Sequence, residues 1–190
     1  MCSGKSNIRM DLEELGVATI DCDKLGHRSY EIGMPAYQKI IETFGVDVLD
    51  ANKNIDRSKL RSLIKIKENN DKLKEIVWPE IRKLLDSEVA SLYSKGHKII
   101  VVEAALLLDG KWHENMNEIW VCFVPNDEAI ERALKRNPNL SRDEANALLG
   151  SQLSNKTRLS YANVAFCSIW ERSVTKRQVL KAWNLMNKRI

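Results

Sequence analysis

The sequence has 190 residues, of which 44% are apolar and 29% charged, a composition that suits a globular protein with a substantial core. No apolar run reaches the roughly 18 residues of a membrane span, and the N-terminus MCSGKSNIRM has no hydrophobic signal segment. The net charge is +4, but basic and acidic residues alternate along the chain, so nucleic-acid binding is only a weak alternative. The four cysteines form no CxxC pair and predict neither a disulfide nor a zinc site. We expect one reduced, intracellular domain over residues 1–190.

Helices and short apolar strands alternate along the chain. Helices are expected from SGKS to about residue 15, from Pro35, from about residue 57, over 71–95, 127–136 and 142–150, and at the C-terminus. Pro79 should kink or divide the helix over 71–95 because it cannot donate a backbone hydrogen bond. Strands are expected over 17–21, 98–102, 118–124 and 163–167. This alternation predicts an α/β fold, a parallel sheet with helices on both faces.

The segment Ser3-Gly4-Lys5-Ser6 precedes a predicted helix and matches the second half of a P-loop, GxxxxGK[ST]. In such a loop, backbone N–H groups cradle phosphates, the lysine meets the β- and γ-phosphates, and the following hydroxyl holds magnesium. The first glycine of the motif and the strand that feeds it would fall before Met1. We therefore expect an N-terminally incomplete domain that binds ATP weakly compared with a version extended upstream.

Two acidic residues stand where strands end. Asp23 follows the strand over 17–21 and could accept a proton from a reacting hydroxyl, or it could simply N-cap a helix that begins near Lys24. Asp21, two residues earlier, should point to the same side and could tune Asp23. Glu103 ends an apolar run over 99–102 in the manner of a Walker B acid, which would hold magnesium. The alternative is an acid that merely ends a strand.

Several stretches, taken in order, resemble the dephospho-CoA kinase family along nearly the whole chain. They are SGKS, LGVATIDCDKLGHRSY, GMPAYQKIIETFG, NIDRSKL, VWPEI, VVEAALLLDGKW, ERALKRNPNLS and SQLS. The WPEI variant and the segment SIWERSVTKRQVLKAW are similar to the kinase half of the eukaryotic bifunctional coenzyme A synthase. The adenylyltransferase signature HxGH does not occur, so that half would be fused upstream or associate as a separate partner.

The resemblance implies a three-layer P-loop NTPase fold of the nucleoside-monophosphate-kinase type, with its central first strand absent from this chain. It implies ATP-dependent phosphorylation of the ribose 3′-hydroxyl of dephospho-coenzyme A, the last step of coenzyme A biosynthesis, with ATP and Mg2+ as cofactors. A cytoplasmic location is expected, and a mitochondrial association is left open.

The family's residues carry over onto two groups of positions. For the nucleotide, Ser3, Gly4, Lys5 and Ser6 would bind ATP, with Ser6 also serving the metal. Arg132 and Arg136 are spaced to lie on one helix face and would belong to a mobile lid that meets the phosphates, unless they form only a solvated face.

For the acceptor, the second acid of the DxD, Asp23, would be the catalytic residue, and Lys5, Arg132 and Arg136 would assist the transfer. His27 of LGH and Arg57 of IDRSKL would contact dephospho-CoA. The alternative for Arg57 is a surface ion pair with Asp56 or Asp50. Many relatives carry an arginine where this chain has Leu148, which removes one phosphate contact.

Two other functions compete with this kinase. One is a catalytically impaired nucleotide-binding or interaction module derived from it, which the incomplete P-loop favours. The other is a P-loop kinase for a different acceptor, which would keep residues 4–6 but would not need the DCD…LGH…FG series.

Overall fold

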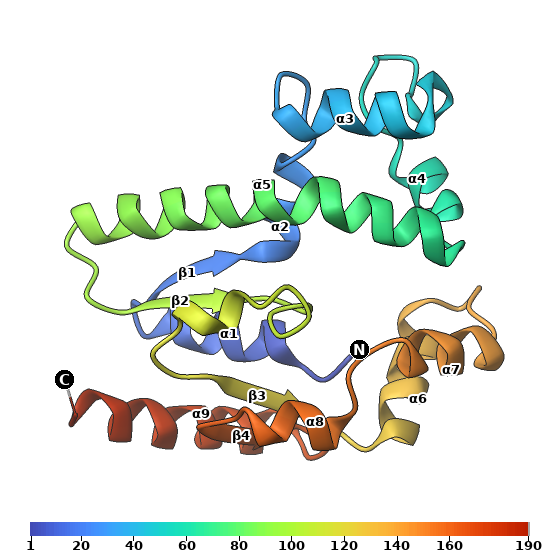
Figure 1. Ribbon diagram of the computed structural model, residues 1–190. Coiled ribbons are helices and arrows are strands. Elements are labelled where there is room, and N and C mark those ends of the chain that lie inside the picture. Colours follow the sequence, from blue (N-terminus) through green and yellow to red (C-terminus); the bar gives the residue numbers. More distant parts are fainter. Residues whose placement is uncertain (190) are drawn as a thin grey trace. The chain divides into compact units, whose positions relative to one another are not determined.

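The computed structural model describes residues 1–189 (Figure 1). The chain divides into two compact units: unit 1 contains residues 1–19 and the chain from Ala105 onward, and unit 2 contains Ile20–Ala104. Within residues 1–189, no helix is both long and apolar enough to cross a membrane.

Unit 1 contains most of the helices of the C-terminal half and one pair of strands. Its elements are α1 (Lys5–Glu14), the 3-10 turn η2 (Trp112–Asn115), β3 (Trp120–Phe123), α6 (Asn126–Arg136), α7 (Arg142–Gly150), α8 (Asn155–Ser160), β4 (Val164–Cys167) and α9 (Arg172–Asn187).

The centre of unit 1 is a parallel pair, in which β3 runs beside β4 with Trp120 opposite Val164 and Phe123 opposite Cys167. Helix α9 packs on β4 and on α1, and α8 packs on β3. Phe166, Leu12 and Val179 are among the fully buried side chains of the chain. Burial of such side chains supplies most of the driving force for this packing.

Unit 2 is organised around one long helix. Its elements are β1 (Ala18–Asp21), which begins two residues before the unit boundary, α2 (Cys22–Arg28), α3 (Pro35–Phe44), the 3-10 turn η1 (Val46–Val48), α4 (Arg57–Leu63), α5 (Lys67–Ser94) and β2 (Ile100–Glu103). Strands β1 and β2 pair, and α2, α3 and β2 pack against α5, the long green helix of Figure 1. Pro35 opens α3 at its first turn, where the missing N–H has no helical partner to lose.

The predicted alternation of helices and strands is confirmed, with two differences. Helix α5 is continuous from Lys67 to Ser94, so Pro79 does not divide it; Pro79 lies between buried Val77 and Ile81, whose packing offsets the lost backbone hydrogen bond. The short helix α8 was not among the predicted elements, and α2 was considered only as an alternative, as a helix that begins near Lys24. Residues 1–4 form no strand, and within residues 1–189 the strands form two separate pairs, β1–β2 and β3–β4.

Candidate active site

The phosphate-loop match lies at the start of α1. Gly4 is the N-cap in the left-handed conformation (φ 86°, ψ 14°), Lys5 is the first helical residue, and the exposed Ser6 follows it. The Gly4 carbonyl accepts hydrogen bonds from the amides of Asn7 (3.0 Å) and Ile8 (3.3 Å). The first turn contains no acidic residue, so the helix dipole and the positive charge of Lys5 both favour an anion here.

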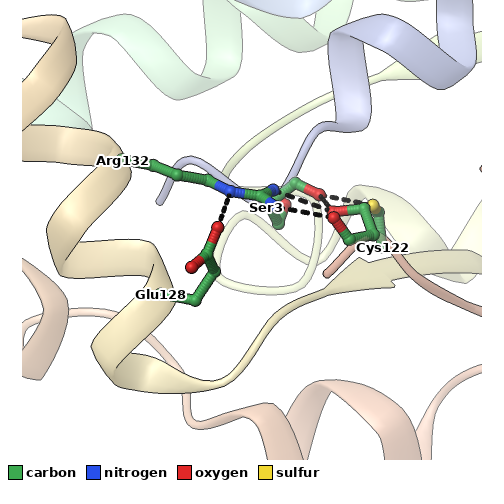
Figure 2. A network of polar contacts seen from close by, with 5 residues as sticks. Ser3, Cys122, Glu128 and Arg132 are labelled. Atoms are coloured by element: carbon green, nitrogen blue, oxygen red, sulfur yellow. Dashed lines mark hydrogen bonds and ion pairs between the residues drawn. The ribbon is translucent and has the colours of Figure 1, made fainter. Parts of the chain in front are cut away.

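A buried polar network fixes the residue before this turn (Figure 2). The Ser3 carbonyl oxygen accepts hydrogen bonds from the Cys122 thiol on β3 and the Ser168 hydroxyl just after β4, each with a separation of 2.6 Å. Ser3, Cys122 and Ser168 are all buried. Burial raises the pKa of the Cys122 thiol, so it keeps its proton at neutral pH and can donate it. Residues at the C-terminal end of both strands of the β3–β4 pair thus hold the phosphate loop.

Arg132 of α6 extends the same network (Figure 2). Its Nε donates to the Glu128 carboxylate at 2.6 Å, Nη1 to the Ser168 hydroxyl at 3.1 Å and Nη2 to the Ser168 carbonyl at 2.6 Å. Arg136, one turn further along, is exposed and makes no polar contact with any of residues 1–189. The two arginines predicted to act together therefore have different environments, one held inside unit 1 and the other open to solvent.

In unit 2, Asp21 ends β1 and Asp23 follows it, and the structure shows which of the two caps the next helix. The Asp21 Oδ1 accepts the amides of Asp23 (3.0 Å) and Lys24 (3.3 Å) and is the N-cap of α2. The alternative that Asp23 caps this helix is therefore wrong. The Asp23 side chain is exposed in the first turn of α2. Asp21 orients this turn, because an N-cap fixes the backbone of the residues whose amides it binds.

His27, further along α2, is paired with Tyr30. Their Nδ1 and hydroxyl oxygen lie 2.7 Å apart. Burial lowers the pKa of His27, and the positive charge of Arg57 lowers it further, so the ring is held neutral. Arg57 also hydrogen-bonds Tyr30, and Arg61, one turn later on α4, is close enough to act electrostatically on both rings. Arg57 forms no ion pair within residues 1–189, so the alternative surface pair with Asp56 or Asp50 is not formed.

Glu103 is buried at the end of β2, in unit 2. Within residues 1–189, no cluster of three or more His, Cys, Asp or Glu side chains could hold a metal by itself. The Glu103 carboxylate and the Ser6 hydroxyl, each taken within its own unit, are of the oxygen type that Mg2+ accepts, since this ion usually takes one or two protein oxygens and completes its shell with water and phosphate.

Sequence reasoning missed Cys122, Ser168 and Tyr30. Cys122 lies in an apolar strand, where a thiol is indistinguishable from a small hydrophobic residue. Ser168 follows β4 and is 165 positions away from Ser3, so no local pattern links them. Tyr30 carried a weaker signal, since it stands three residues after His27 in a segment already singled out, in the turn that follows the end of α2 at Arg28.

Comparison with known proteins places the chain in one family. The family model described as dephospho-CoA kinase matches residues 1–168. A dephospho-CoA kinase of Carboxydothermus hydrogenoformans is 36% identical over 183 residues, covering 95% of this chain and 87% of the relative. The enzyme of the same name from Bacillus anthracis is 31% identical, with 98% and 95% covered. These relatives are bacterial, and the expected association with an adenylyltransferase finds no support in them.

The fold agrees with two solved structures. A Thermus thermophilus protein superposes with a TM-score of 0.78 at 22% identity, covering 97% of this chain and 92% of that one. A dephospho-CoA kinase from Campylobacter jejuni superposes with a TM-score of 0.73 at 23% identity, covering 99% and 94%. The P-loop NTPase fold predicted from the sequence is thereby confirmed. With a family model that spans residues 1–168 and full-length relatives above 30% identity, the chain belongs to the dephospho-CoA kinase family.

Proposed function

We propose that this protein is a dephospho-CoA kinase, which transfers the γ-phosphoryl group of ATP to the ribose 3′-hydroxyl of dephospho-CoA. The observation that carries the proposal is the Gly4-Lys5-Ser6 turn, which opens α1 in an anion-binding conformation in a chain that belongs to this family. The competing interaction module is not favoured, because such a module would not need this turn to be kept in its binding geometry.

Unit 1 supplies the groups for the nucleotide. The amides at the start of α1 and the Lys5 ammonium bind the β- and γ-phosphates of ATP. Arg136, exposed at the end of α6, would bind phosphate oxygens as a lid residue. The Ser6 hydroxyl is an oxygen ligand of the kind that Mg2+ takes, and the metal when bound would neutralise charge on the phosphates; the Glu103 carboxylate of unit 2 is a second oxygen group of that kind.

Unit 2 supplies the groups for the acceptor. The 3′-oxygen forms a bond to the γ-phosphorus while the bond from that phosphorus to the β–γ bridging oxygen breaks and ADP leaves. The Asp23 carboxylate accepts the proton of the attacking hydroxyl as a general base, or it orients this hydroxyl by a hydrogen bond. Arg57 and the His27–Tyr30 pair bind the anionic acceptor, with the arginine supplying the positive charge.

The test is release of ADP with dephospho-CoA, with and without Mg2+, together with identification of the position phosphorylated. We expect ADP release that depends on both, and a product phosphorylated at the ribose 3′-hydroxyl. Coenzyme A itself is the matched control, because its 3′-position is already phosphorylated and it should give no ADP. Lys5→Ala should weaken both nucleotide binding and turnover. ADP release that another alcohol supports and dephospho-CoA does not would assign the chain to a different acceptor.

A further inference from the structure

Both lone pairs of the Ser3 carbonyl oxygen are used in the network. The Ser3 carbonyl oxygen has two lone pairs, and the Cys122 thiol and the Ser168 hydroxyl each donate to one of them. A hydroxyl has one hydrogen and two lone pairs, so Ser168 can give its only hydrogen to Ser3 while its oxygen accepts from Arg132 Nη1. The Arg132 guanidinium thus settles which way the Ser168 hydroxyl points.

Fixing this carbonyl also fixes the amide that follows it. The C=O of Ser3 and the N–H of Gly4 belong to one planar trans peptide and point in opposite directions. With the carbonyl held by β3 and by the residue after β4, the Gly4 amide is directed away from the strands. Ser168 also closes the space beside Gly4, since a Cβ built there would lie 3.2 Å from the Ser168 hydroxyl oxygen.

The geometry points to a donor relay, Arg132 to Ser168 to Ser3, in which Ser168 is a positioning residue of the phosphate loop and Arg132 orients the loop through Ser168. The inference deepens the proposed function, since it rests on this loop being the one that binds the phosphates of ATP. It gives Arg132 a role that does not require contact with the nucleotide. It also adds Ser168 and Cys122 to the residues on which nucleotide affinity depends.

The planar fork of arginine is what the relay uses. Nη1 and Nη2 reach the hydroxyl and the carbonyl of the same residue, Ser168, while Nε is held by Glu128. A lysine at this position would keep the charge but could not hold both Ser168 atoms in a fixed geometry. Arg132→Lys and Arg132→Gln should therefore have similar effects, whereas a role through charge alone would leave Arg132→Lys close to the unchanged protein.

The experiment is a double-mutant cycle read out as the dissociation constant of ATP, without acceptor, on the full chain. We expect Ser168→Ala to weaken ATP binding by about three- to tenfold, the effect of one hydrogen bond. Arg132→Gln should weaken it by no more than that, and the double variant should match the weaker-binding single variant within about twofold. Ser160→Ala and Arg142→Gln are the controls; both residues lie in unit 1, away from the network, and should leave ATP affinity unchanged.

Cys122 provides a second, less disruptive arm. Cys122→Ser keeps a donor for the Ser3 carbonyl and should bind ATP like the unchanged protein, whereas Cys122→Ala removes that donor and should bind less tightly. Melting temperature is recorded for every variant. A loss of ATP affinity that only parallels a fall in melting temperature, with Cys122→Ser as weak as Cys122→Ala, would make the network structural and overturn the proposal.

Two further outcomes would also overturn it. If the effects of Arg132→Gln and Ser168→Ala multiply, then Arg132 contacts the nucleotide independently of Ser168. If Ser168→Ala binds ATP as tightly as the unchanged protein, the hydroxyl does not position the loop. Because ATP is titrated without dephospho-CoA, a protein that binds ATP but does not phosphorylate this acceptor would refute the proposed function alone. A protein that binds no ATP would refute both.

Discussion

Two arginines of unit 1 and two arginines of unit 2 differ in whether they have a carboxylate partner. In unit 1, Arg132 pairs with Glu128, and Arg172 of α9 pairs with Asp11 of α1, a carboxylate that is only 1% exposed. In unit 2, Arg57 and Arg61 lie one turn apart on α4, and neither has a carboxylate partner within residues 1–189. Arg132 and Arg172 are therefore neutralised within unit 1, while α4 of unit 2 presents positive charge that an anionic ligand can neutralise.

Because of this difference, substitutions in unit 1 and substitutions on α4 should have different effects. The contacts of unit 1 order the phosphate loop before a nucleotide arrives, so their loss should lower stability or nucleotide affinity. The arginines of α4 contribute little to the folded state by themselves, so their loss should change acceptor binding and leave stability unaffected. The predictions that follow test this contrast, from the largest effect to the smallest.

Asp23→Asn should lower kcat by roughly 100-fold or more, because the amide cannot accept the proton of the attacking hydroxyl. Asp21→Asn is the matched control, since it removes the same charge two residues away and asparagine caps a helix as well as aspartate does. Its kcat should stay within about tenfold of the unchanged protein. Steady-state kinetics with dephospho-CoA measure both variants, and equal losses in the two would remove Asp23 from the chemistry.

Arg172→Met should lower the free energy of unfolding by about 1–3 kcal/mol, because it leaves the buried Asp11 carboxylate without its partner. This range is kept below the value for a fully buried pair, since the Arg172 side chain is itself 41% exposed. Lys176→Met removes a pair of the same two helices, with Glu14, that is exposed on both sides, and should leave the free energy of unfolding nearly unchanged. Denaturant titration of both variants decides; equal costs would mean that α1 is not held to α9 by this buried pair.

Arg57→Gln and Arg61→Gln should each raise the KM for dephospho-CoA by about three- to tenfold while leaving the KM for ATP and the melting temperature unchanged. The control is Arg28→Gln in the same unit, whose guanidinium is already paired with Glu88 at 2.6 Å. That variant should bind the acceptor normally. A lower melting temperature in the α4 variants, with an unchanged KM, would show that these arginines stabilise the fold instead.

His27 should make a small contribution to the pH dependence of stability. Its folded pKa is lowered by burial and by Arg57, below the ordinary value of about 6.5 that it regains on unfolding. The unfolded chain therefore binds the proton more readily, and stability falls as the pH drops through about 6.5 until the folded pKa is passed. His27→Gln should flatten the melting temperature between about pH 5 and 7, and Arg57→Gln should do so in part. An unchanged slope in His27→Gln would exclude this residue as its source.

The parts of the fold with local sequence signals were predictable. The order of helices and strands followed from apolar periodicity, and Gly4-Lys5-Ser6 located the phosphate loop at the start of a helix. Pro79 misled because its cost is local, whereas the burial of Val77 and Ile81 that offsets it depends on the tertiary structure. The choice between Asp21 and Asp23 as the cap depended on a helix start two residues earlier than expected.

The contacts that hold the loop were not predictable in the same way. Ser3 meets Cys122 and Ser168 only because β3 and β4 pair in one register, which brings together residues separated by more than a hundred positions. Nothing in the neighbourhood of Ser168 distinguishes it from any other serine that follows a strand. The proposed catalytic and acceptor residues, Asp23, His27 and Arg57, remain predictions that the kinetic tests above decide.

The close approach of Ser168 to Gly4 limits which residues members of this family can have at these two positions. A side chain there would need a positive φ that L-residues rarely adopt, and its Cβ would meet the hydroxyl oxygen of Ser168. Position 4 therefore disfavours any residue other than glycine on two grounds, while a larger side chain at position 168 would crowd Gly4 further. Relatives that replace Ser168 should then also have changed at the positions of Cys122 or Arg132, so that covariation among these three positions would record the loop geometry across the family.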